Sequence, residues 1–103
     1  MPELQVIARH RMRPGMQDQI LPLLPQLVEA ARREPGNIAF VVYRQLDDEL
    51  NYVLLERYAS REAFEEHRQT QHFKDIILDQ IVPRLESRTI ECFDVADEGP
   101  GQV

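Results

Sequence analysis

Lysine, cysteine and tryptophan are scarce in this chain. Among its 103 residues, 12 are Lys or Arg and 18 are Asp or Glu, so the formal net charge is −6. Lysine occurs once, as Lys74, and tryptophan is absent. With no basic run or patch, a nucleic acid would meet net repulsion, and so would an anionic membrane. We therefore expect no nucleic-acid partner and no membrane partner.

The sequence also shows no sign of disulfide or metal-binding cysteines and no recognisable targeting segment. Cys92 is the only cysteine, so no disulfide can staple the chain and no CxxC or Cys/His cluster exists. We expect its thiol to be reduced and packed in a strand of a cytoplasmic protein. The longest apolar stretches, such as residues 38–43, are much shorter than a membrane span. The first ten residues lack the cationic region and apolar core of a signal peptide.

The apolar pattern alternates between the strand period and the helix period. The extended segments are predicted at 4–11, 38–45, 51–58 and 87–95, and the helical ones at 16–33, between Ser60 and Thr70, and at 72–82. Pro22 and Pro25 interrupt the first helical segment, which predicts either a late start or a kink. Ser60 and Thr70 are typical N-cap residues, and Thr70 predicts a break in the second helical unit.

This order of elements predicts an α+β fold, a ferredoxin-like βαββαβ plait with an antiparallel sheet. We expect residues 1–95 to form one domain and residues 96–103 to be a disordered tail. The strands are apolar in both registers: in residues 38–43 one carries Ile38 and Phe40, the other Val41 and Tyr43. Both sheet faces should therefore be covered, and a face-to-face homodimer is the economical way to cover the second.

Two stretches carry a family resemblance, EPGNIAFVVYRQLDD at 34–48 and NYVLLERYASREAFEEHRQTQHFK at 51–74. Their combined spacing closely resembles the antibiotic biosynthesis monooxygenase (ABM) family, in its small quinol monooxygenase branch. The resemblance implies a dimeric α/β-barrel with a pocket between helices and sheet. It also implies oxygenation without metal or other cofactor. Relatives oxidise quinols or anthrones, isomerise sugars, degrade haem or have no assigned activity, so the substrate stays open.

His67 is the first candidate catalytic residue. At about 100° per residue it lies near 40° from Ala63, in the middle of the apolar face of its helix. It is therefore either a core histidine with a hydrogen-bond partner or a base lining a dry pocket. A metal role is disfavoured, because His67 and His72 are five residues apart and Thr70 breaks the helix between them.

Glu56 is the second candidate catalytic residue, because its register places a carboxylate on a largely apolar face. Such a group must be paired, hydrogen-bonded or protonated, and Arg44 on the neighbouring strand is a plausible partner. His10, between two arginines, is expected to be a solvated edge residue. The expected substrate-binding residues are His72, Tyr58, Phe64, Phe73 and Arg44.

Three functions follow as alternatives. The first is a cofactor-independent monooxygenase that oxidises a small aromatic quinol or anthrone with O₂, using a base, a donor for the anion and exclusion of water. The second is a non-catalytic dimeric small-ligand or stress-response module, which Phe64, Phe73 and Tyr58 would favour if they filled the pocket. The third, haem degradation, is disfavoured. The haem-degrading branch has tryptophan at the place of His67 and a histidine ligand where this chain has Ile77.

Overall fold

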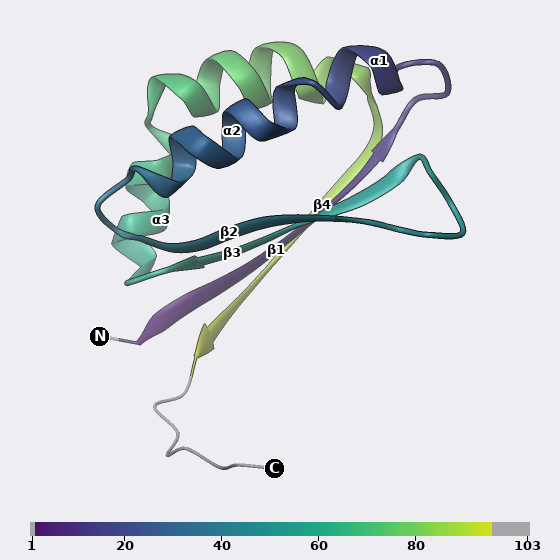
Figure 1. Cartoon of the computed structure of the whole chain (residues 1–103). Coiled ribbons are helices and arrows are strands. Elements are labelled where there is room, and N and C mark those ends of the chain that lie inside the picture. The colour runs from purple at the N-terminus through teal and green to yellow at the C-terminus, as the bar shows by residue number, and fades with distance from the viewer. Residues whose placement is uncertain (1, 96–103) are drawn as a thin grey trace.

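Four antiparallel strands form one sheet whose single covered face carries all the helices (Figure 1). This is a computed structural model that describes residues 2–95, so the expected tail at 96–103 lies outside the described residues. The elements are β1 (Glu3–Met12), α1 (Gln17–Ile20), α2 (Leu23–Arg32), β2 (Asn37–Arg44), β3 (Asn51–Tyr58), α3 (Arg61–Arg68), η1 (Phe73–Ile81), η2 (Val82–Arg84) and β4 (Leu85–Val95). The strand order is β2-β3-β1-β4, which confirms the predicted ferredoxin-like plait.

The two central strands show the alternation expected when one face packs on helices. Even-numbered residues of β1 and β3 are buried, and odd-numbered ones are only partly buried or exposed. The register pairs Val6 of β1 with Glu56 of β3 and with Cys92 of β4, so these three side chains share the helix-covered side. The edge strand β4 extends beyond the helical cover, and Cys92 is exposed there. Our prediction that Cys92 is packed was therefore wrong.

Prolines divide the first helical segment into two helices. α1 ends at Ile20, and α2 begins at Leu23, directly after Pro22. Pro25 lies in the first turn of α2, where an N–H would have no partner within the helix, so its ring is tolerated. The late start is thus confirmed for α2, and the separate turn α1 is an addition that we had not predicted.

The second helical unit begins and breaks where its caps predicted. Ser60 Oγ accepts a hydrogen bond from the Ala63 amide at 3.1 Å, and Thr70 Oγ1 accepts one from the Phe73 amide at 3.2 Å. Residues 73–81 are wound as a π-helix, a rare form that is frequently found at functional sites. Nothing in the local sequence distinguished this winding from an ordinary helix.

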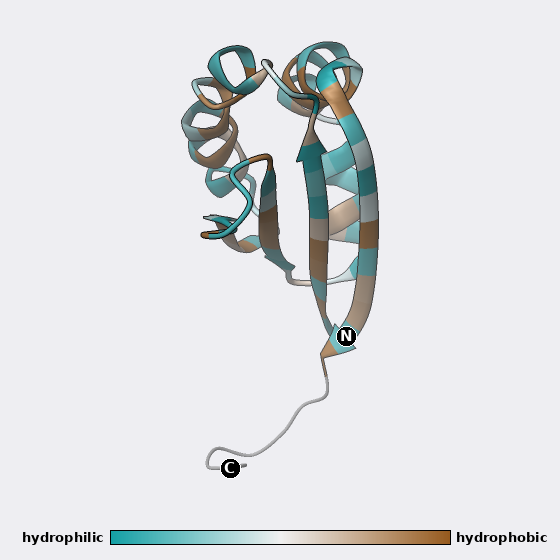
Figure 2. Cartoon of the chain, turned by 90° about the vertical axis from the view of Figure 1, so that its right-hand side faces the viewer, coloured by the Kyte–Doolittle hydropathy of each residue, from teal (hydrophilic) through white to brown (hydrophobic). Residues whose placement is uncertain are grey.

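The other face of the sheet is left uncovered by the described residues (Figure 1). Tyr43 and Phe93 point to that side and are 56% and 50% exposed. Ile7, Val41 and Leu55 share the face by register and are only partly buried. Apolar and polar residues alternate along the strands in Figure 2. The homodimer that we expect would cover this apolar face and stays a prediction. No helix among residues 2–95 has the length and apolar character needed to cross a bilayer.

Candidate functional site

His67 lies deep inside the molecule, as its position on the helical wheel predicted. It is 1% exposed. Its ring is surrounded by aromatic rings, with centroids 5.2 Å from Phe73, 5.3 Å from Tyr58 and 5.9 Å from Phe40. α3 brings it there because its apolar stripe faces β1 and β3, while its charged residues face solvent. The imidazole is therefore held in a fixed, largely dry position.

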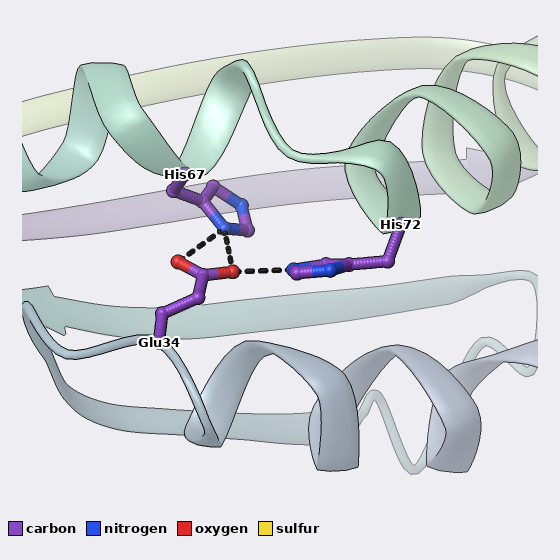
Figure 3. A group of neighbouring side chains, drawn as sticks. All are labelled: Glu34, His67 and His72. Atoms are coloured by element: carbon purple, nitrogen blue, oxygen red, sulfur yellow. Dashed lines mark hydrogen bonds and ion pairs between the residues drawn. The ribbon is translucent and has the colours of Figure 1, made fainter.

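Glu34 links the two histidines of the helical unit (Figure 3). Its carboxylate lies 2.7 Å from His67 Nδ1 and 2.5 Å from His72 Nε2, both measured to Oε2. Burial alone would raise the pKa of Glu34. The hydrogen bonds and charges of the two histidines oppose burial and lower that pKa below its ordinary value. An ionised carboxylate thus accepts an N–H from each ring, and this fixes both orientations.

Glu34 is a site residue that sequence analysis missed: residues 34–36 end the predicted helix and belong to the family resemblance, and neither feature indicated a role for the carboxylate. The glycine is what lets this loop approach α3. A Cβ placed on Gly36 would lie 2.4 Å from the Ala63 Cβ, which is closer than real Cβ atoms come. Absence of that atom brings the loop against the helix, so that Glu34 reaches His67.

The turn at Thr70 explains why two histidines five residues apart converge. Thr70 Oγ1 donates to the His67 carbonyl at 2.7 Å and closes the end of α3. The chain then turns, and His72 enters the next helix facing the same carboxylate (Figure 3). Our argument that spacing and the break would keep the two histidines apart was therefore wrong.

These three side chains are also the group that could hold a metal ion. One donor atom from each of Glu34, His67 and His72 lies within 4.8 Å of the others. Two imidazoles and one carboxylate suit several divalent transition metals. In this structure, however, the Glu34 carboxylate already accepts hydrogen bonds from two imidazole N–H groups. A metal would have to replace both hydrogen bonds.

On its other side His67 faces a second carboxylate. His67 Nε2 lies 3.9 Å from Glu56 Oε1, and that oxygen accepts the Tyr58 hydroxyl at 2.6 Å. Burial raises the pKa of Glu56, and burial with the nearby Glu56 raises that of Tyr58. The buried position predicted for Glu56 is confirmed, since it is 4% exposed.

Arg44 is not the partner of Glu56. It is exposed at the end of β2, pairs in register with Tyr52, and donates to the Glu49 carbonyl at 2.6 Å. Phe40 is the residue that stands opposite Glu56 on β2. Our prediction of a salt bridge between Arg44 and Glu56 was therefore wrong. The position of Arg44 at the end of the hairpin keeps it away from the pocket beside His67.

A pocket of about 310 Å³ opens beside His67, between the sheet and the helices. His67, Glu56, Phe64 and Phe73 line it, as our list of candidate residues expected. Three other expected residues, His72, Tyr58 and Arg44, are not among its lining side chains. Tyr58 packs against the rings of His67 and Phe64 instead. The aromatic residues thus border a space rather than filling it.

His10 also lines this pocket, which corrects our expectation of a solvated residue. It is 2% exposed, and its Nδ1 lies 2.8 Å from the Tyr52 hydroxyl. Burial, with a smaller effect of the Arg88 charge, lowers the pKa of His10 to about 3. The strand register carried the signal that we missed: His10 belongs to the same buried set as Val6 and Ala8.

The sheet, its helices and the histidine-lined pocket between them together form a ferredoxin-like α+β domain. The family model described as Antibiotic biosynthesis monooxygenase matches residues 4–77. The chain belongs to this family.

Relatives and solved structures agree with this assignment. The chain is 37% identical over 68 residues to Putative monooxygenase Rv0793 of Mycobacterium tuberculosis, covering 66% of each chain. It is 25% identical over 67 residues to Putative monooxygenase YcnE of Bacillus subtilis, covering 65% of this chain and 70% of the relative. The solved structure of Rv0793 superimposes with a TM-score of 0.85 at 30% identity, over 93% of this chain and 97% of that one. These relatives support a monooxygenase-type function.

Proposed function

We propose that this protein is a cofactor-independent monooxygenase that oxidises a small aromatic quinol or anthrone-type substrate with O₂. The observation that carries the proposal is the oriented imidazole of His67. Its Nδ1 is held by Glu34, and the ring borders the pocket beside Glu56. The family supplies the reaction class, and the pocket supplies the space for a substrate.

In this proposal His67 is the general base. If the Nδ1 proton is shared with Glu34, the lone pair of the neutral ring is on Nε2, which can take a proton from the substrate. Glu34 is a positioning residue, because it fixes the tautomer and stabilises the imidazolium that forms, as a carboxylate does in a catalytic triad. Glu56 Oε1 lies 3.9 Å from Nε2 and accepts the Tyr58 hydroxyl, and in this proposal Glu56 assists the base from that side of the pocket.

The chemistry requires no electron source besides the substrate. Removal of a proton from an anthrone methylene gives a stabilised carbanion, which passes one electron to O₂. The resulting radical and superoxide combine to a peroxide at that carbon, which is protonated by the imidazolium. Loss of water then leaves a carbonyl group. The balance is R₂CH₂ + O₂ → R₂C=O + H₂O, with one oxygen atom in each product. The protein supplies the base, orientation and exclusion of water.

We further propose that the working form is a homodimer joined through the uncovered sheet face. The support is the apolar character of that face, on which Tyr43 and Phe93 are half exposed. Half-exposed aromatic side chains on a sheet face that also carries Ile7, Val41 and Leu55 favour an interface there.

A non-catalytic small-ligand-binding module is the second candidate, and the open pocket favours it as much as it favours an enzyme. Filling of the pocket by Phe64, Phe73 and Tyr58 would have favoured the non-catalytic alternative over the enzyme. Turnover is what separates an enzyme from a binding module.

The deciding experiment supplies anthrone and ¹⁸O₂ to the purified protein in the presence of EDTA. We expect oxygen consumption and a quinone that contains one labelled oxygen atom, with the second label in water. His67→Ala should lower the rate by about 10²-fold or more, the usual scale for a positioned base. His67→Gln, which keeps a polar contact without a base, should be equally slow. No turnover across a panel of quinols and anthrones would leave the binding module as the better reading, and a rate abolished by EDTA would overturn cofactor independence.

A further inference from the structure

The pocket has a second polar end, distant from His67. His10 lies four residues along β1 from Val6, the residue that opposes Glu56, which is roughly 13 Å of extended chain. Arg88 stands directly opposite His10 on β4, and both side chains line the pocket. The alternation of β1 turns the His10 side chain to the helix-covered side, where the pocket lies. The proposed catalytic reaction makes no use of either residue.

Two buried nitrogen atoms at this end have no hydrogen-bond partner among the described residues. They are His10 Nε2 and Arg88 Nε. Buried polar atoms in folded proteins are almost always satisfied, and each exception requires an explanation such as a missing ligand. Both exceptions in residues 2–95 belong to cross-strand neighbours that line one pocket, so that one bound group could serve both.

The kind of partner that is missing follows from the His10 tautomer in which the Tyr52 hydroxyl donates to Nδ1. Burial raises the pKa of Tyr52, so its hydroxyl keeps its proton and can donate to His10 Nδ1 at 2.8 Å. The proton of the neutral imidazole is then on Nε2, which makes that atom a donor. Arg88 Nε can only donate. Two neighbouring donors require an acceptor, and a guanidinium favours a negatively charged oxygen.

The charges along the pocket agree with an anionic group. Arg68, Lys74 and Arg88 line it, and Glu56 is the carboxylate that faces them. This local excess of positive charge occurs in a chain whose formal net charge is −6. Burial also lowers the pKa of Arg88, so its charged form is held at a cost that a bound anion would offset.

We propose that His10 and Arg88 form a carboxylate-binding subsite, so that the substrate is an aromatic acid whose reacting ring lies beside His67. The subsite determines specificity and takes no part in proton transfer. This inference names the substrate class of the proposed function, but its test requires only binding and no turnover.

The test compares two probes that differ in one charge, 1-hydroxy-2-naphthoate and its methyl ester, by isothermal titration calorimetry under argon. The unmutated protein should bind the acid at least tenfold more tightly than the ester. Arg88→Met, which keeps much of the side-chain volume, should weaken binding of the acid about tenfold and that of the ester less than twofold. Arg88→Lys keeps the charge and loses the forked donors, so its affinity for the acid should lie between those of the unmutated protein and Arg88→Met.

Arg33→Met is the matched control, because it removes one exposed arginine directly after the end of α2 and should leave both affinities unchanged. Thermal melting establishes that every variant is folded. His10→Gln provides an independent variant and should selectively weaken the acid. Equal affinity for acid and ester, absence of binding by the acid, or parallel loss of both probes in Arg88→Met would each overturn the proposal. Failure of the oxygenation assay would leave these binding results unaffected.

Discussion

At the scale of single residues, one carboxylate organises the site. Glu34 is 10% exposed in its side chain and accepts from two imidazoles that come from either side of a helix break. Its hydrogen bond fixes the orientation of the His67 ring, whereas the surrounding aromatic rings only limit the volume in which that ring can move. In a catalytic triad, a carboxylate in this position holds the imidazole in its reactive tautomer and stabilises the imidazolium that forms.

Glu34→Gln is therefore expected to lower kcat by about 10–100-fold with little change in KM, since the imidazole would remain but lose its orientation and its counter-charge. Glu29→Gln, an exposed change on α2, is the control. A purely structural role would leave kcat and KM unchanged per folded molecule.

His10 predicts a specific pH dependence of stability. Its pKa is about 3 in the folded protein against 6.5 when exposed, so between these values the unfolded chain binds more protons. The contribution of His10 to the free energy of unfolding is therefore fully present above about pH 6.5 and is lost as the pH falls toward 3. At pH 5 the loss from this residue is about 2 kcal/mol.

Urea unfolding at pH 7 and pH 5 measures this loss. In His10→Gln the difference between the two pH values should shrink by about that amount, about 2 kcal/mol. His72→Gln leaves His10 intact and serves as comparison. An unchanged pH difference in His10→Gln would show that His10 is not neutral and buried in solution.

At the scale of elements, the contact between the loop 33–36 and α3 sets the distance from Glu34 to His67. Gly36→Ala would force two Cβ atoms into overlap, and we expect a loss of about 1–3 kcal/mol in unfolding free energy. Ala63→Gly removes the atom on the other side and should cost about 1 kcal/mol through helix propensity alone.

The double variant Gly36→Ala, Ala63→Gly tests that cause directly. Its loss should be smaller than the sum of the two single losses, because the clash exists only when both Cβ atoms are present. Denaturant unfolding of all four proteins gives the coupling energy. Strictly additive losses would mean that the backbone of Gly36, and not its close approach to Ala63, is what the position requires.

Elements were largely predictable from sequence, because their signals are local. Ser60 and Thr70 act through amides three residues away, and the alternation in β3 extends over eight neighbouring residues. The contacts of the site are of another kind. Glu34 meets His67 across 33 positions, and its sequence surroundings suited a helix end equally well. His10 was misplaced because we weighed its neighbours Arg9 and Arg11 above its register with Val6 and Ala8.

At the scale of the whole molecule, the uncovered sheet face predicts association. Light scattering at micromolar concentration should give twice the chain mass of 12.1 kDa. Leu55→Glu places a charge in the middle of that face and should give a monomer of lower stability. Leu46→Glu is the control, because Leu46 is fully exposed in the hairpin turn, outside the sheet face. A stable, folded monomer of the unmutated chain would contradict this prediction.

The sharing of Glu34 by two histidines also has a consequence for how such a gene can change over time. Because both imidazoles depend on one carboxylate, a single codon change at position 34 removes the partner of both while leaving the apolar core untouched. The core, by contrast, draws on residues from most helices and from all four strands, so no one substitution erases it. Under the proposed function, a duplicated copy of this domain would lose its chemistry in one step and stay folded, which makes position 34 the first place to look when active copies are sorted from silent ones.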